Sequence, residues 1–155
     1  MTYRKDEKPA ITVRRAAMNL LARREQTFVE LVRKVTEKYP DIDADEVILP
    51  ALERLREENL QSDERFAESF VRYRSSRGVG PLKIDMEMQQ RGLAGALIQH
   101  ALFNGDVDWV GICTDVAKKK FPEGIGESPQ DKARCYRFLA QRGFSSDQIK
   151  EAALQ

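Results

Sequence analysis

The sequence predicts an all-α fold, a tandem array of three degenerate three-helix units with about nine helices in total, elongated and curved. Apolar residues recur at helical spacing almost throughout, and the alternating runs that mark strands are missing. Helix caps and turns also recur along the chain. We expect an N-terminal flexible tail at residues 1–10, followed by units at 11–60, 62–104 and 106–154.

The first unit is expected to hold three amphipathic helices. The first spans about Ile11 to Arg24, and Thr27 with Glu30 has the spacing of a capping box for the second. The third begins near Asp43, with Glu46 three positions later. The predicted inward residues are Val13, Ala16 or Ala17, Leu20, Leu21, Phe28, Leu31, Val32, Val35, Val47, Ile48, Ala51, Leu52 and Leu55.

Pro50 leaves two interpretations of the third helix open. A proline inside a helix removes one backbone hydrogen bond and clashes with the preceding turn. The unbroken apolar spacing favours a kinked helix that runs through Pro50. The alternative is a helix that begins nearer Leu49, which places the proline in its first turn.

The second unit begins with its clearest helix signals. Ser62 or Asp63 caps a helix on which Phe66, Phe70 and Tyr73 share one face by spacing. We assign Phe66, Phe70 and Trp109 to the core. Gly78 suits the end of this helix, and Pro81 suits the first turn of the next.

The three-helix pattern recurs at unequal spacing along the chain. The turns Gln-Arg-Gly-Leu at 90–93 and Gln-Arg-Gly-Phe at 141–144 match, and residues 121–129 read as an exposed connector. Amphipathic helices also align by chance, which is the alternative explanation. The aligned columns are Leu31, Ile84 and Cys135; Val35, Met88 and Leu139; Val47, Ile98 and Ile149; Val13, Phe66 and Trp109; and Ala17, Phe70 and Cys113.

Composition narrows the class of protein. The chain has 155 residues, 41% hydrophobic and 33% charged, which is typical of a soluble globular protein. No apolar stretch has the length of a membrane span or a secretory signal, so we expect a cytoplasmic protein with no membrane partner. Cys113 and Cys135 are expected to be reduced, buried thiols.

Motifs for catalysis are missing from the sequence. His100 is the only histidine, and no nucleophile, phosphate-loop or Cys/His ligand motif is present. A helix precedes Gly78-Val79-Gly80, whereas a dinucleotide site needs a strand there. We therefore predict no enzyme activity, no cofactor, no metal and no small-molecule substrate. A hydrolase or nuclease whose carboxylates converge only in the fold is a weaker alternative.

Basic residues are the remaining candidates for binding. Lysines and arginines number 26 against 25 acids, so the formal charge is +1 and any cationic surface has to be local. Each basic group is ordinarily explained by solvation at a helix end. The candidate partner-binding residues are Arg72, Arg74, Arg77 and Lys83, followed by Arg23, Arg24, Arg134 and Arg137. A further basic group in the third unit, which includes Lys118, Lys119, Lys120 and Lys132, is not among these candidates.

One stretch resembles a known family closely. It runs from Leu60 through Asp63-Glu64-Arg65-Phe66-Ala67, then Arg77-Gly78-Val79-Gly80-Pro81, to a helix ending Gln90-Arg91-Gly92. This pattern is similar to the RecX family, and Asp108-Trp109 and the lysines before Phe121 extend the resemblance over most of the chain. Three departures from the pattern occur. Tyr39-Pro40 replaces the Gly-aromatic end of the other two units, Asn59 stands where a glycine is common, and Ala94-Gly95-Ala96 weakens the start of the third helix in the second unit.

The resemblance implies a fold and a function. RecX proteins are nine-helix modular regulators that bind the RecA filament on single-stranded DNA, within its groove. They inhibit the recombinase, ATPase and coprotease activities of RecA, and so act in DNA repair and the SOS response. A direct nucleic-acid-binding helical module that acts without RecA is the alternative function, and weak direct DNA contact is compatible with either.

Overall fold

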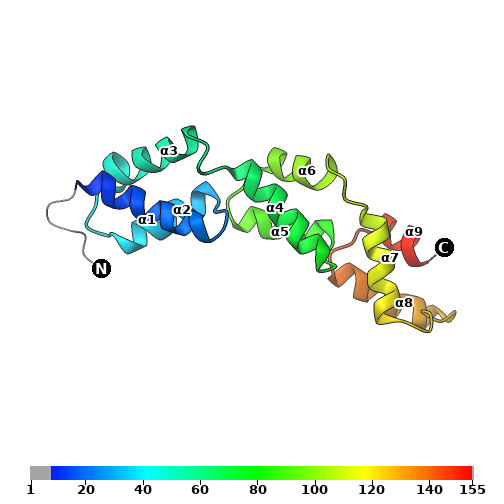
Figure 1. Ribbon diagram of the computed structural model, residues 1–155. Helices are drawn as coiled ribbons and strands as arrows, with labels where there is room; N and C mark the ends of the chain where they lie inside the picture. The colour runs from blue at the N-terminus through cyan, green and yellow to red at the C-terminus, as the bar shows by residue number, and fades with distance from the viewer. Residues whose placement is uncertain (1–7, 155) are drawn as a thin grey trace. The chain divides into compact units, whose positions relative to one another are not determined.

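Nine α-helices and one π-helical turn form the secondary structure of residues 8–154, the residues that the structure, a computed structural model, describes (Figure 1). Strands are absent from this range, so the all-α prediction is confirmed. The elements are α1 Pro9–Arg23, α2 Phe28–Lys38, η1 Ala44–Ile48, α3 Leu49–Glu57, α4 Asp63–Ser76, α5 Pro81–Gln90, α6 Gly95–Phe103, α7 Trp109–Lys120, α8 Pro129–Gln141 and α9 Ser146–Ala153.

The chain packs into two compact units. One holds the described residues up to Ser69 together with Arg91–Ala94, and the other holds Phe70–Gln90 with the residues from Gly95 onward. Of the expected tail at 1–10, residues 1–7 lie outside the described residues, and α1 already begins at Pro9. The expected boundaries at 11–60, 62–104 and 106–154 and the elongated, curved outline stay predictions.

The core of the first unit is the one that helical spacing predicts. Thr27 and Glu30 form a complete capping box, in which each side chain accepts a hydrogen bond from the backbone N–H of the other at 3.0 Å. The predicted inward residues are either fully buried or packed against the buried cluster. Burial of this stripe orients α1, α2 and α3 around one apolar centre.

The third helix adapts to Pro50 with a change of helix type. Asp43 caps a π-helical turn, η1, by accepting from the N–H of Glu46 at 2.9 Å, and α3 then begins at Leu49 with Pro50 in its first turn. The favoured interpretation, one α-helix kinked at its seventh residue, is therefore wrong. The wider turn shifts the register by one position, so Ile48 is buried and its neighbour Val47 is only partly buried.

The buried side of α4 differs from the predicted aromatic stripe. Phe66 and Val71 are buried, Phe70 is half-buried, and Tyr73 is 56% exposed. The apolar side of the helix is centred between Phe66 and Ala67 and continues through Val71 and not through Tyr73. The face that Phe66, Phe70 and Tyr73 share by spacing is therefore offset from the buried side, because spacing alone fixes a helix face only to within about one residue.

The second unit has its own buried core. The aligned residues Ile84, Met88, Ile98, Cys113, Cys135, Leu139 and Ile149 are all fully buried. Trp109, also buried, donates its indole N–H to the backbone carbonyl of Leu102 at 2.9 Å, so its one polar atom is satisfied. This bond ties the start of α7 to the end of α6.

The helix-ending turns follow the predicted chemistry. Gly143 has φ 103°, and the N–H of Phe144 reaches back to the carbonyl of Leu139 at 3.2 Å, as in a Schellman motif. Asn59 has φ 60° and ends α3 in the same way. Asparagine is the residue after glycine that best tolerates this conformation, which explains the departure from the family pattern there.

Candidate functional site: a basic cleft in the second unit

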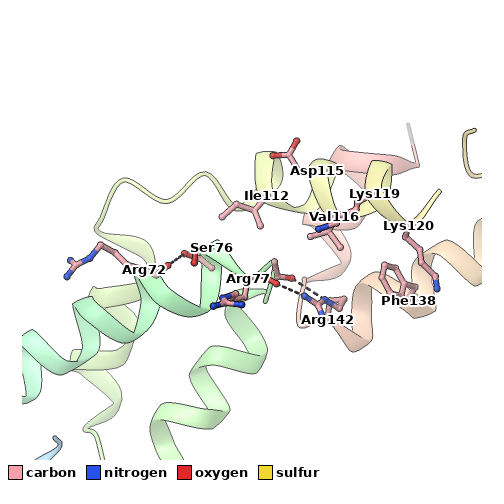
Figure 2. A pocket seen from close by; sticks show the side chains of 12 residues that line it. Arg72, Ser76, Arg77, Ile112, Asp115, Val116, Lys119, Lys120, Phe138 and Arg142 are labelled. Atoms are coloured by element: carbon pink, nitrogen blue, oxygen red, sulfur yellow. Dashed lines mark hydrogen bonds between the residues drawn. The ribbon is translucent and has the colours of Figure 1, made fainter. Parts of the chain in front are cut away.

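A cleft of about 1060 Å³ lies in the second unit, between the C-terminal end of α4 and the helices α7 and α8 (Figure 2). Its residues come from three places in the sequence, which the fold brings together. The lining comprises Arg72, Ser75, Ser76, Arg77 and Gly78 from the end of α4, Ile112, Asp115, Val116, Lys119 and Lys120 from α7, Phe138 from α8, and Arg142 from the turn after it. The site carries five cationic side chains and one carboxylate.

Arg142 links the turn after α8 to the end of α4 by hydrogen bonds. Its guanidinium donates to the backbone carbonyl of Arg77 at 2.7 Å and to that of Gly78 at 3.2 Å (Figure 2). These carbonyls end α4, where the helix dipole is negative and favours a cation. The turn that carries Arg142 is bonded as well, because Gly80 donates its N–H to the Arg142 carbonyl at 2.7 Å.

A similar contact, in which the arginine carbonyl of a Gln-Arg-Gly turn accepts a hydrogen bond at the start of a helix, occurs in the first unit. There the carbonyl of Arg91, in the matching Gln-Arg-Gly turn, accepts from the hydroxyl of Thr27 at 2.7 Å. Each turn therefore meets the beginning of a second helix, α2 in one unit and α5 in the other. The closeness requires glycine: a Cβ on Gly92 would lie 2.7 Å from the Cβ of Val29.

Two of the four principal candidates line the cleft. Arg72 stands at its margin, with its guanidinium pointing away from α7 in Figure 2, and Arg77 lies with its guanidinium 5.2 Å from the ring centre of Tyr73. Arg74 does not line the cleft and instead forms a bidentate ion pair with Glu87 at 3.1 Å. Lys83 is exposed at the beginning of α5, beside Gly143.

The secondary candidates lie elsewhere. Arg134 and Arg137 are exposed on α8 and do not line the cleft, and Arg134 pairs with Asp131 at 3.4 Å. Arg23 and Arg24 are exposed at the end of α1 in the first unit, where Arg24 pairs with Glu30 at 3.2 Å. The structure thus gathers Arg72 and Arg77 into one site and leaves these four outside it.

Sequence reasoning missed three of the five cleft cations as leading candidates. Lys119 and Lys120 belong to the basic group of the third unit, outside the candidate residues, and Arg142 enters the sequence analysis only as part of the repeated Gln-Arg-Gly turn. The repeated Gln-Arg-Gly turn was the available signal for Arg142. Contact between this turn and the end of α4 depends on tertiary packing, which periodicity does not reveal.

The two thiols are structural. Cys113 and Cys135 are both fully buried, as expected, and neither forms a disulfide. Burial, with a smaller contribution from Cys135, raises the pKa of Cys113 to about 11. The reactive thiolate is therefore scarce at neutral pH, and Cys113 packs as a small apolar side chain.

Residues 8–154 contain neither a membrane-spanning helix nor a metal-binding cluster. No helix in this range is both long and apolar enough to cross a bilayer. No three His, Cys, Asp or Glu side chains within it gather in an arrangement that holds a metal ion.

Comparison with known proteins gives one consistent answer. Residues 62–102 match the second three-helix domain of RecX, and residues 107–153 match the third. The regulatory protein RecX of Pseudomonas putida (strain GB-1) is 48% identical over 139 residues, which cover 90% of this chain and 87% of that protein. The RecX protein of Halorhodospira halophila (strain DSM 244 / SL1) is 41% identical over 141 residues, 91% of this chain and 86% of that one.

Solved structures share the fold. The crystal structure of RecX from Lactobacillus salivarius superposes with a TM-score of 0.80 at 24% identity, covering 92% of each chain. Family models that together match more than half of the chain, and relatives nearly half identical over most of its length, lead to the same assignment. This chain belongs to the RecX family of regulatory proteins.

Proposed function

We propose that this protein is a non-enzymatic regulator of the RecA recombinase. It binds the RecA filament on single-stranded DNA, within the filament groove, and inhibits the recombinase, ATPase and coprotease activities. The observation that carries the proposal is the 48% identity to a RecX regulatory protein over 90% of the chain. Identity at this level, over nine-tenths of the chain, supports a shared partner as well as a shared fold.

The basic cleft supports the same proposal. A formal charge of +1 gives the chain little general attraction to a polyanion, so recognition depends on charges held in a defined place. The cleft cations Arg77, Lys119 and Lys120 provide such a place. Proposed contacts with the filament also include Arg72 at the cleft margin, and Arg74, Lys83, Arg23, Arg24, Arg134 and Arg137 outside the cleft.

The test is the ATPase activity of RecA on single-stranded DNA, titrated with this protein. We expect inhibition at less than one molecule per RecA protomer, since one regulator in the groove blocks a cooperative assembly. Direct binding to the same DNA without RecA is measured alongside. If saturating protein leaves ATP hydrolysis unchanged, regulation of RecA is ruled out.

A further inference from the structure

The cleft in the second unit combines charge with apolar surface in a way that selects among ligands. Cations surround it on three sides: Arg77 at the end of α4, Lys119 and Lys120 at the end of α7, and Arg142 in the turn after α8. Asp115 is its single acidic residue. The excess of positive charge fits an anionic ligand, in a concave site where solvent screening is weaker than on an open surface.

Part of this charge is preorganised. Arg142 is fixed by its two hydrogen bonds to the carbonyls of Arg77 and Gly78. The end of α4 and helix α7 are also in close contact, since a Cβ on Gly78 would lie 2.8 Å from a methyl carbon of Val116. A ligand that enters therefore meets a cation whose position requires little further ordering.

The apolar part of the cleft lining is mostly aliphatic, and its one aromatic ring, Phe138, already has two partners. Ile112, Val116 and Phe138 are half-buried there. The Phe138 ring packs edge-on against Phe121, with centroids 6.0 Å apart, and the Lys120 ammonium lies 5.2 Å from its centre. Aliphatic side chains fit this surface, whereas single-stranded nucleic acid is normally held by bases stacked on exposed rings.

Asp115 also favours a polypeptide over a nucleic acid as the ligand of the cleft. Its carboxylate is exposed at the edge of the cleft and points away from Arg142 in Figure 2. A continuous phosphodiester chain passing this edge meets like-charge repulsion. A polypeptide can instead present a backbone N–H, a hydroxyl or a lysine to Asp115 while its own carboxylates face the cations.

We propose that the cleft between α4, α7 and α8 is a binding site for a short acidic segment of a protein, one in which carboxylate side chains alternate with aliphatic ones. Carboxylates pair with Arg77, Lys119 and Lys120, and aliphatic side chains cover Val116 and Ile112. This inference rests on the proposed function, because the segment belongs to the protein that this chain regulates.

Direct titration of labelled ligands tests the inference. The full-length protein is titrated into a fluorescent peptide of alternating Glu and Leu, the same peptide with Gln in place of Glu, and an oligothymidylate. We expect the Glu peptide to bind at least about tenfold more tightly than the Gln peptide, since charge-assisted hydrogen bonds are lost in the latter. The oligothymidylate is expected to bind more weakly than the Glu peptide.

Matched variants locate the site. Lys119→Ala with Lys120→Ala is expected to weaken Glu-peptide binding about tenfold. Lys118→Ala with Lys132→Ala removes the same charge from exposed residues outside the cleft and is expected to leave binding unchanged. Asp115→Asn is expected to strengthen it, and thermal unfolding confirms that each variant is folded.

Several results overturn the inference: equal binding of the Glu and Gln peptides, tighter binding of the oligothymidylate, or equal losses in the two lysine pairs. RecA ATPase inhibition by the wild-type protein is measured in parallel. If the protein inhibits RecA but does not bind the Glu peptide, the acidic-segment inference is rejected and the proposed function is retained. If the protein binds the Glu peptide but does not inhibit RecA, the proposed regulation of RecA is rejected and the cleft is retained as a binding site for an acidic segment.

Discussion

At the scale of single residues, Glu30 is a buried charge of the first unit with several partners. Its side chain is 8% exposed and pairs with Arg91 at 3.0 Å and Arg24 at 3.2 Å. Burial alone raises its pKa, but the Thr27 N–H and then the two arginines outweigh burial and lower the pKa below the ordinary 4.5. Glu30 thereby links the cap of α2 to the turn that carries Arg91.

The lowered pKa makes the stability of the folded state depend on pH. A carboxyl whose pKa is depressed on folding stabilises the protein above its unfolded pKa, and that stability is lost as pH falls through the folded pKa. Glu30→Gln keeps the capping acceptor but removes the charge. We expect it to lower the free energy of unfolding by about 1 kcal/mol at neutral pH, because both arginines are partly exposed and screened.

The difference between wild type and Glu30→Gln is expected to narrow below about pH 4.5. Urea unfolding at neutral pH and near pH 3.5 measures it. Glu37→Gln is the control, since Glu37 is 65% exposed in an ion pair with Arg33 at 3.6 Å. A gap between wild type and Glu30→Gln that stays constant with pH would contradict the assignment.

At the scale of elements, the Gln-Arg-Gly turn joins one helix end to another. Gly143 has φ 103°, and a Cβ there would lie 2.6 Å from the Cβ of Lys83 and 2.9 Å from its backbone nitrogen. Its own carbonyl accepts from the N–H of Leu82 at 2.9 Å. Both the conformation and the space require glycine.

Gly143→Ala is therefore expected to lower the free energy of unfolding by about 3 kcal/mol, from backbone strain and overpacking together. Gly124→Ala is the matched control: its φ is 99°, but nothing lies within 4 Å of its Cβ, so strain alone costs about 1–2 kcal/mol. Chemical denaturation compares the two. Equal losses would show that the close approach to α5 contributes nothing.

The sequence predicts local features such as caps and turns, but it does not predict contacts between residues far apart in the chain. Thr27, Glu30 and Gly143 were predicted correctly because capping and left-handed turns depend on neighbours within a few residues. The aligned column contains Val47, whereas the fully buried residue of the pair is Ile48, because a π-helical turn adds one residue per turn without any sequence motif of its own. Arg142 was missed as a site residue because its partners lie 64 and 65 residues away.

At the scale of the whole molecule, the balance of charge bears on the proposed binding to a polyanionic filament. With 26 basic and 25 acidic residues, the net charge is only +1, so attraction comes from local groups at close range. At physiological ionic strength the screening length is about 8 Å, comparable to the approach of a side chain to its partner. Inhibition of RecA is thus expected to depend on salt through the cleft cations and not through net charge.

Two variants with equal net charge separate these contributions. Each removes two lysines and takes the formal charge from +1 to −1, since 1 − 2 = −1: Lys119→Ala with Lys120→Ala inside the cleft, and Lys118→Ala with Lys132→Ala outside it. Raising NaCl from about 50 mM to about 200 mM is expected to raise the half-inhibitory concentration of wild type several-fold. The outer pair is expected to follow wild type, and the cleft pair to inhibit weakly with a shallower dependence on salt.

ATP hydrolysis by RecA alone at each salt concentration normalises the titrations. Identical behaviour of the two lysine pairs would mean that net charge, and not the cleft, governs the encounter.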